Sequence, residues 1–299
     1  MPLLLEYFFN VPCKLIIIII ITSLLIGLFI ILGIKNPFIF PDKIKRHPHD
    51  IFSPHKVFIE AHCGINREIF QNTLESFSKA IEYGIDSLET DLWLTKDNVL
   101  VIVHCTSNGS LKGYYNSSEN IMNLTWDELS NLRTVKDNLK MPKLVDLFKI
   151  AKNKIYIDLE LKDPRVDLVF PHVIKLIEEY DFFNQLSICS IHYEYYNKIK
   201  EYNNKNNKKI LFGFGYTKKH KNEIDFNKKG NTINIHWTEA TKEICDKTHL
   251  KGMGVVAWFG LSEYEKEENY ESIIQNGVDV IVANYPKIAK NVRDRLYKY

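Results

Sequence analysis

The sequence predicts an α/β protein, a (β/α)8 barrel (TIM barrel) preceded by one N-terminal transmembrane helix. After Val57, short apolar runs typical of β-strands alternate with patterns typical of helices. Strands that are apolar on both faces and separated by helices indicate a parallel sheet. About eight β-then-α units in ~240 residues favour closure of that sheet into a barrel over an open sheet. An uncharged apolar segment near the N-terminus predicts the membrane helix.

The membrane helix is predicted at residues 15–34, which are mostly Ile and Leu, carry no charge and lie between Lys14 and Lys35. About 20 apolar residues at ~1.5 Å each cross a hydrocarbon layer of ~30 Å. A cleaved signal peptide is the alternative, but the run exceeds its usual ~7 to 15 apolar residues and no small-x-small site follows. The chain therefore divides into a tail at 1–14, an anchor at 15–34, a proline-containing linker at 35–56 and a barrel domain at 57–299.

The side of the membrane on which the barrel lies is not fixed by the sequence. The basic residues gather just after the anchor, which by the positive-inside rule places the barrel in the cytosol: Lys35, Lys43, Lys45 and Arg46. Three Asn-x-Ser/Thr sequons, which matter only for a lumenal domain, begin at Asn108, Asn116 and Asn123. We therefore predict a single-pass membrane protein and leave the membrane and the orientation open.

Composition excludes some classes of partner. A formal net charge of +2 gives no global field that would attract nucleic acid, so an anionic ligand must be held by local residues. Five cysteines, an odd number without short repeated spacing, describe neither a disulfide scaffold nor a zinc ribbon. Protein partners and the oligomeric state are not predicted.

The strand-like runs are short, rich in Val, Ile and Leu, and bounded by polar or turn residues. They occupy residues 57–62, 87–94, 99–104, 155–161, 186–191, 210–215, 232–236, 253–259 and 278–283. Helices are expected to open at Asn72-Thr73, to cover 125–133 and 143–152, and to begin near 165, 193, 238, 264 and 287. The Asn- and Lys-rich residues 201–209 and the basic residues after Thr217 are interpreted as solvated loops.

Acidic pairs at the ends of two predicted strands suggest a cation site. Side chains two apart share one face of a strand, so Glu89 lies beside Asp91, and Glu160 beside Lys162. Glu89, Asp91 and Glu160 would supply hard oxygen ligands that suit Mg²⁺ or Ca²⁺ and leave positions open for a phosphate oxygen and water. An isolated acidic pair is more often a solvated strand end, so the spacing alone does not establish a metal.

Two histidines make the hypothesis sharper, because His62 and His104 each end an apolar run, and barrels place catalytic groups at strand carboxyl ends. Imidazole exchanges a proton near neutral pH. Phosphodiester cleavage needs one group that deprotonates the attacking oxygen and one that protonates the leaving alkoxide. A metal ion and Lys162 would offset charge on the phosphoryl oxygens.

These motifs resemble those of the glycerophosphodiester phosphodiesterases, whose TIM barrel carries His-Arg-Gly, Glu-Asn-Thr, Glu-x-Asp, His-Asp and Glu-x-Lys in this order. The similarity also includes residues 124–129, 141–144, 255–259 and 276–286, so it covers nearly everything after Val57. The motif positions here read His62-Cys63-Gly64, Gln71-Asn72-Thr73, Glu89-Thr90-Asp91, His104-Cys105 and Glu160-Leu161-Lys162.

The resemblance implies a role for each matching residue. It makes His62 and His104 the acid/base pair. It also implies a pocket-shaping role for Trp258 in the late strand, where a core aromatic is the alternative. The metal ligands it implies are Glu89, Asp91 and Glu160.

Three positions depart from the family pattern. Cys63 replaces an Arg that contacts phosphate, Gln71 replaces a Glu, and Cys105 replaces an Asp. Loss of one charge-assisted phosphate contact would cost about 1.5 to 3 kcal/mol. Sphingomyelinase D enzymes, a related barrel family, keep two histidines and the Glu-x-Asp pair without that Arg, but their third ligand is an Asp, unlike Glu160.

The cysteines suggest further hypotheses. Cys63 and Cys105 follow the two histidines, so they are candidates for a disulfide or a soft-metal pair, with independent drift as the alternative. A disulfide requires Cα atoms closer than ~7 Å. Cys189 and Cys245 fit inert core thiols, and Cys13 is a candidate for acylation by position alone.

The function expected from the sequence is divalent-cation-dependent hydrolysis of glycerophosphodiesters or lysophospholipids by a membrane-anchored enzyme. One alternative is a phospholipase of the sphingomyelinase D type. The other is a catalytically impaired, anchored barrel that binds lipid or phosphate, motivated by the three departures. Headgroup and acyl specificity and the identity of the metal are not predicted.

Overall fold

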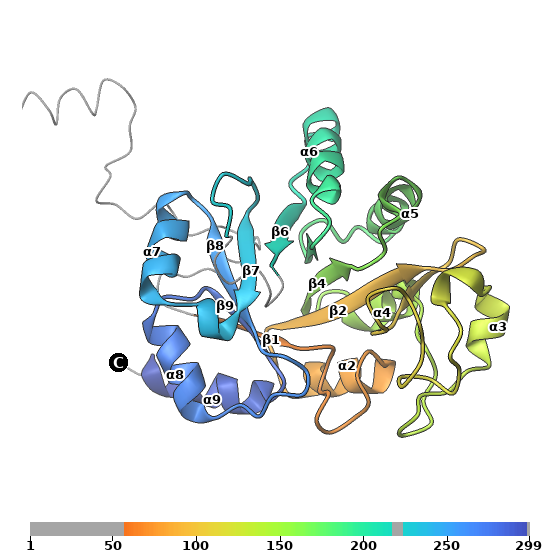
Figure 1. Ribbon diagram of the computed structural model, residues 1–299, viewed down its shortest axis with the longest axis horizontal. Helices are drawn as coiled ribbons and strands as arrows, with labels where there is room; N and C mark the ends of the chain where they lie inside the picture. Colours follow the sequence, from red (N-terminus) through yellow and green to blue (C-terminus); the bar gives the residue numbers. More distant parts are fainter. Residues whose placement is uncertain (1–56, 217–223, 298–299) are drawn as a thin grey trace, which may run out of the picture. The chain divides into compact units, whose positions relative to one another are not determined.

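A computed structural model of the chain describes residues 57–216 and 224–297 (Figure 1). The predicted anchor, linker, residue Cys13 and basic segment after Thr217 lie outside the described residues. No helix in the described part is long and apolar enough to cross a membrane.

Eight parallel strands close into a barrel, which confirms the barrel part of the predicted fold. Neighbouring strands pair in parallel throughout, and β1 pairs with both β9 and β2, so the ring has no open edge. The barrel strands are β1 (Phe58–Ala61), β2 (Ser87–Leu94), β4 (Tyr156–Leu161), β5 (Leu186–Ser190), β6 (Leu211–Gly215), β7 (Thr232–His236), β8 (Gly254–Trp258) and β9 (Val280–Ala283).

One predicted strand is not part of the ring. β3 (Leu100–Ile102) pairs antiparallel with β2 and forms a hairpin with it, so the expectation that His104 ends a barrel strand was wrong. A tight turn causes the reversal: Asn98 adopts the left-handed conformation (φ 64°), and the Val99 amide donates to the Thr95 hydroxyl over 2.8 Å. β3 runs antiparallel along the carboxyl-terminal part of β2. The carboxyl end of β3 therefore lies near the barrel rim.

Helices surround the strands at nearly the predicted positions. Their bounds are α2 (Leu74–Glu82), α3 (Trp126–Ser130), α4 (Leu144–Ala151), α5 (Val166–Glu179), α6 (Glu194–Asn206), α7 (Lys242–Leu250), α8 (Glu267–Gln275) and α9 (Pro286–Leu296), with short 3-10 turns at Ile121–Asn123 and Trp237–Glu239. The main difference is at 201–206, which belongs to α6 and is not a loop. Its polar residues continue the solvent-facing side of that helix.

Alternation along the strands separates two apolar layers. Ile59 and Ile157 pack in the large core shared with the helices, whereas their neighbours Phe58 and Tyr156 pack with residues of β8 and β9 in a second, smaller cluster. This second cluster fills the inside of the barrel. The inward face of β1 therefore carries Phe58, Glu60 and His62, and that of β4 carries Tyr156, Asp158 and Glu160. The site residues lie at the end of the barrel, next to the apolar cluster that fills its inside.

The last helix, α9, contacts the barrel through a buried arginine. Arg293, 1% exposed, donates to the backbone oxygen of Val57, 3.2 Å away, and pairs with Asp86. We expect Arg293→Leu to lower the free energy of unfolding by about 1–3 kcal/mol, because it leaves the partly buried Asp86 without its cation. Chemical denaturation measures this. Arg295→Leu is the matched control, since Arg295 makes exposed ion pairs that contribute little to stability. Equal losses in both variants would contradict the prediction.

Candidate active site

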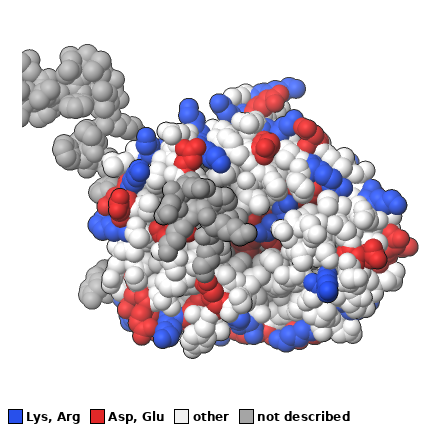
Figure 2. All heavy atoms as spheres, viewed as in Figure 1, with Lys and Arg blue, Asp and Glu red and all other residues white. Residues whose placement is uncertain are grey.

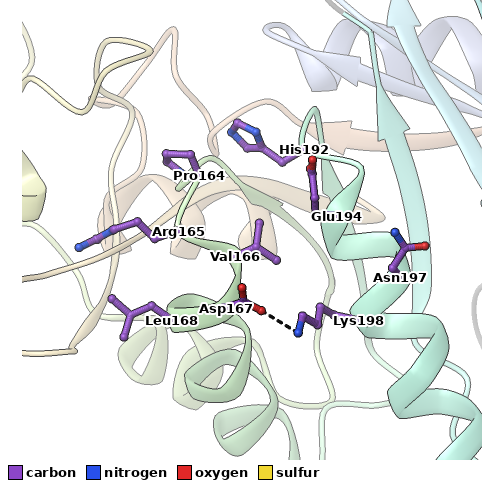
Figure 3. A pocket seen from close by; sticks show the side chains of 9 residues that line it. All are labelled: Pro164, Arg165, Val166, Asp167, Leu168, His192, Glu194, Asn197 and Lys198. Carbon is purple, nitrogen blue, oxygen red and sulfur yellow. Dashed lines mark ion pairs between the residues drawn. The ribbon is translucent and has the colours of Figure 1, made fainter.

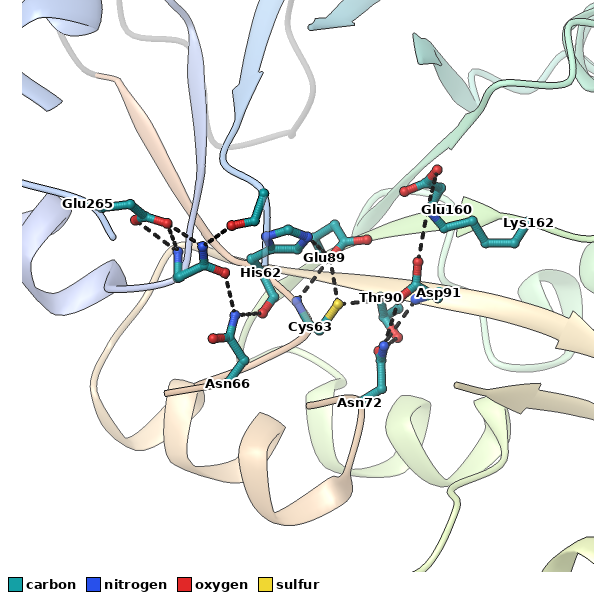
Figure 4. Close-up of polar contacts among 12 residues, drawn as sticks. His62, Cys63, Asn66, Asn72, Glu89, Thr90, Asp91, Glu160, Lys162 and Glu265 are labelled. Atoms are coloured by element: carbon teal, nitrogen blue, oxygen red, sulfur yellow. Dashed lines mark hydrogen bonds and ion pairs between the residues drawn. The ribbon is translucent and has the colours of Figure 1, made fainter. Parts of the chain in front are cut away.

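The three predicted metal ligands converge at one end of the barrel (Figure 4). Glu89 and Asp91 point to the same side of β2, and Asp91 is the direct parallel partner of Glu160 on β4. Carboxylate oxygens of Glu89, Asp91 and Glu160 lie within 4.8 Å of one another. The shared-face prediction is therefore correct, and the three oxygens are close enough to bind one ion.

Burial and charge make this cluster electronegative. Burial, with the nearby Asp91 and Glu160, raises the pKa of Glu89 well above its ordinary value. Burial also raises the pKa of Glu160. Asp91 differs: burial acts to raise its pKa, but Lys162, His104 and the Asn72 amide outweigh burial and lower it to about 2. Three carboxylates in one buried place favour a cation, which would relieve the repulsion among them.

Lys162 supplies one positive charge at the cluster. Its Nζ lies 2.7 Å from Glu160 Oε1 and 3.2 Å from Asp91 Oδ1, which confirms that Glu160 and Lys162 share a face. Burial would lower the pKa of Lys162, but the surrounding carboxylates raise it well above its ordinary value. One ammonium does not balance three carboxylates, so a divalent ion has a place beside it.

His62 follows β1 and faces the cluster. Its Nε2 lies 3.9 Å from Glu89 Oε2. Burial is the main cause that lowers the pKa of His62 to about 4, and this leaves the ring neutral at pH 7 and able to accept a proton. Asn66 holds the local backbone, since its Nδ2 donates to the His62 carbonyl and to Asn284 Oδ1, each over 2.7 Å.

His104 reaches the same place from the hairpin. The Val103 amide donates to the Asp91 carbonyl over 3.0 Å, and the His104 ring packs on Tyr114 with centroids 5.0 Å apart. Burial lowers the pKa of His104, while Asp91 opposes the shift. The charge on His104 also lowers the pKa of His62, so the two rings lie within electrostatic reach. The structure thus brings both histidines to the acidic cluster.

Cys63 points into the acidic cluster. Its backbone is left-handed (φ 52°), its amide donates to Glu89 Oε2 over 2.9 Å, and its Sγ lies 3.3 Å from Asp91 Oδ2. Burial, together with Asp91 and Glu89, raises the pKa of this thiol well above its ordinary value. Cys63 and Cys105 are both free, so the disulfide hypothesis was wrong. Cys189 and Cys245 are free and buried, as expected.

The turn that aims Cys63 depends on the next residue. Gly64 has φ 85°, and a Cβ there would overlap the Ser76 side chain of α2. Only glycine combines this backbone with so close an approach. The His-x-Gly motif is therefore explained by geometry at the start of the site.

Sequence reasoning missed the residues that position the acids. Asn72 Nδ2 donates to Asp91 Oδ2 over 2.7 Å, and its Oδ1 accepts from the Thr90 hydroxyl at 2.9 Å. Thr73 caps α2, which fixes Asn72 at the turn. The Asn-Thr pair before a helix was a usable signal. By contrast, no local signal pointed to Asn284, whose amide donates to Glu265, a carboxyl whose pKa burial raises to about 7.

Trp258 lies at the rim of the barrel. It ends β8, packs on the cluster inside the barrel and meets the ring of His236 edge-on at 4.8 Å. This placement fits a pocket wall and a core aromatic equally, so its substrate-binding role stays a prediction.

One groove in the described part of the structure contains none of the predicted site residues (Figure 3). It has a volume of about 660 Å³ between the starts of α5 and α6. The ion pair between Lys198 Nζ and Asp167 Oδ1, 2.7 Å, crosses it, so those charges are already matched. Figure 2 shows both signs of charge interspersed on the viewed face, in keeping with the net charge of +2.

Comparison with known proteins shows which family the chain belongs to. The sequence profile of the glycerophosphoryl diester phosphodiesterase family matches residues 62–288, which include every residue of the cluster. The chain belongs to this family. It is accordingly a phosphoric diester hydrolase, and its family hydrolyses glycerophosphodiesters, generally with a divalent cation.

Individual glycerophosphodiester phosphodiesterases support the assignment. The chain is 24% identical over 253 residues to the glycerophosphodiester phosphodiesterase of Caldanaerobacter subterraneus, covering 79% of this chain and 98% of that protein. A phosphodiesterase from Oleispira antarctica, solved with the product sn-glycerol-3-phosphate, superimposes with a TM-score of 0.65 at 16% identity, covering 80% and 97%. The Agrobacterium tumefaciens enzyme gives 0.66 at 16%, covering 80% and 99%. The two structures show the fold.

Proposed function

We propose that this protein hydrolyses glycerophosphodiesters or lysophospholipids with a divalent cation, Mg²⁺ or Ca²⁺, held by Glu89, Asp91 and Glu160, and with His62 and His104 as acid and base. The observation that carries the proposal is the convergence of the three carboxylates within 4.8 Å, with His62 3.9 Å from Glu89 and His104 within electrostatic reach of Asp91. These five residues come from four separate segments of the chain, and their gathering at the carboxyl end of the barrel is typical of catalytic sites on this fold.

The donor set fits a hard cation. All three ligands offer carboxylate oxygens, and the remaining positions would be free for a phosphoryl oxygen and water. When bound, the ion polarises the phosphoryl group and offsets the charge that develops on its oxygens. Lys162, paired with Asp91 and Glu160, adds a second positive charge close to the same oxygens.

The two histidines carry out the proton transfers. One imidazole, neutral because it is buried, accepts the proton of the attacking oxygen; the other donates a proton to the departing alkoxide. The donating ring must first gain its proton, and the anionic phosphodiester favours this because its negative charge stabilises imidazolium. Trp258 at the rim would form one wall for the group beside the phosphate.

The substrate class is supported by the relatives. The Oleispira antarctica structure contains sn-glycerol-3-phosphate, the product that a glycerophosphodiester yields. Cys63 in place of the family's Arg leaves one phosphate contact fewer, so we expect weaker turnover than in relatives that keep the Arg, and a larger share of charge neutralisation by the ion and Lys162.

A product assay separates this proposal from its alternatives. We expect the full chain with Mg²⁺ or Ca²⁺ to release free glycerol phosphate from glycerophosphocholine, and the matched His62→Ala protein to release it at least about 10²-fold more slowly. Cyclic ceramide phosphate from sphingomyelin would instead favour the sphingomyelinase D type. Equal background in both proteins on every substrate would favour the impaired, phosphate-binding barrel.

Membrane attachment through residues 15–34 is part of the proposal and rests on the sequence alone. It would place the site near lipid, which suits a lysophospholipid substrate. We expect the full chain to stay with the membrane pellet during alkaline extraction; release into the supernatant would contradict a spanning anchor.

A further inference from the structure

The corner of the site nearest β1 has a different chemistry from the three carboxylates. His62 Nε2 or Nδ1, Cys63 Sγ and an oxygen of Glu89 all lie within 4.8 Å of one another. Nitrogen, sulfur and oxygen donors together are unlike the oxygen-only trio of Glu89, Asp91 and Glu160. Thiolate and imidazole select borderline or soft divalent ions, whereas Mg²⁺ and Ca²⁺ prefer oxygen.

Glu89 Oε2 is the common atom of this corner. It lies 3.4 Å from Cys63 Sγ and 3.9 Å from His62 Nε2. Around a tetrahedral zinc ion, bonds of ~2.0 to 2.3 Å place neighbouring ligand atoms roughly 3.2 to 3.8 Å apart. The sulfur–oxygen separation falls within this range and the nitrogen–oxygen separation lies just above it, so a small side-chain adjustment would close the three donors around one ion.

The backbone already fixes the thiol in place. The left-handed turn at Cys63 and Gly64 turns Sγ toward the acids, and the Cys63 amide bonds Glu89 Oε2 over 2.9 Å. Cys63 is 0% exposed, so the sulfur is held inside the site and not on the surface. A fixed thiol, an imidazole and a carboxylate, with one position left open, describe a three-ligand zinc site.

We propose that His62, Cys63 and Glu89 form a second metal site, specific for a thiophilic divalent ion of the Zn²⁺ class, whose occupation stops phosphodiester hydrolysis. Binding replaces the Cys63 S–H bond with a sulfur–metal bond, and the proton leaves to solvent. The inhibitory part rests on the proposed function. Zn²⁺ would take the lone pair of His62, needed for proton transfer, and Glu89, shared with the Mg²⁺ or Ca²⁺ site.

Cobalt spectroscopy tests the site itself. Full-length protein, reduced and freed of metal under anaerobic conditions, is titrated with Co²⁺, whose thiolate complexes give an intense near-ultraviolet charge-transfer band. We expect the band in the wild-type protein and in Cys245→Ser, a buried thiol of α7, and its loss in Cys63→Ser. Zn²⁺ should displace the Co²⁺, with at least about tenfold weaker binding in Cys63→Ser. An unchanged band in Cys63→Ser would overturn the proposal.

Inhibition tests the consequence separately. With saturating Mg²⁺ present, Zn²⁺ should inhibit wild-type and Cys245→Ser hydrolysis at concentrations at least about tenfold lower than those needed for Cys63→Ser. Equal sensitivity would overturn the regulatory claim. If no hydrolysis occurs under any condition, the proposed function fails, while the cobalt band still decides whether the thiophilic site exists.

Discussion

Alanine at His62 or at His104 should lower kcat for glycerophosphocholine about 10²- to 10⁴-fold, the range expected for loss of a general acid or base. Both rings lie within electrostatic reach of the acidic cluster, and burial lowers the pKa of each, which favours the neutral form that a general base needs. Steady-state kinetics at saturating metal measure the loss. His172→Ala is the matched control, since this histidine lies on the outer helix α5 and should retain wild-type kcat.

A better leaving group should then separate the two roles. With an aryl phosphodiester, whose leaving oxygen needs no proton, the variant that lacks the general acid should regain most of its rate, and the variant that lacks the base should not. Equal recovery in both variants, or kcat within threefold of wild type in either, would be inconsistent with an acid/base pair. Unchanged circular dichroism guards against misfolding as the cause.

Removal of any one carboxylate ligand should weaken binding of the divalent ion. Hydrolysis at low metal concentration should then be abolished. Glu89→Gln, Asp91→Asn and Glu160→Gln each keep the side chain's size and remove one charge from the cluster. We expect the Mg²⁺ concentration for half-maximal rate to rise at least about tenfold. Excess metal should partly restore activity, which it should not do for the histidine variants.

The stability of these variants distinguishes a lost ligand from damage to the fold. Burial and the neighbouring Asp91 and Glu160 raise the pKa of Glu89, so this carboxyl lowers the stability of the metal-free barrel at pH values above its ordinary pKa. Metal-free Glu89→Gln should therefore unfold at a temperature equal to or above that of the wild type. Glu82→Gln, on the exposed side of α2, is the control for both activity and stability. A lowered unfolding temperature for Glu89→Gln alone would point to a structural role.

Much of the fold was predictable because a strand that is buried on both faces is a short, continuous apolar run in the sequence. The runs around Ile59, Leu159 and Ile281 read as parallel strands, and they are. The run before His104 has the same composition but lies in a hairpin, because strand direction depends on the turn at Asn98. The sequence Lys-Asp-Asn between two apolar runs indicates a hairpin turn. The composition of the run itself does not show this.

In the candidate site, too, some features could be predicted from the sequence and others could not. Side chains two apart on a strand must share a face, so Glu89 with Asp91, and Glu160 with Lys162, could be predicted together. The direction of the Cys63 thiol could not, because it follows from a left-handed backbone that cysteine rarely adopts. The long-range amide contact between Asn66 and Asn284 joins residues 218 positions apart, which one sequence without relatives does not reveal.

Calorimetric titration of Mg²⁺ into the metal-free full chain, wild type against Asp91→Asn, tests the convergence of acids and histidines around one ion most directly. The expected result is one Mg²⁺ per chain in the wild type, weaker binding in Asp91→Asn, and hydrolysis that rises with occupancy. Identical Mg²⁺ binding in the two proteins, or full hydrolysis by the metal-free enzyme, would contradict it.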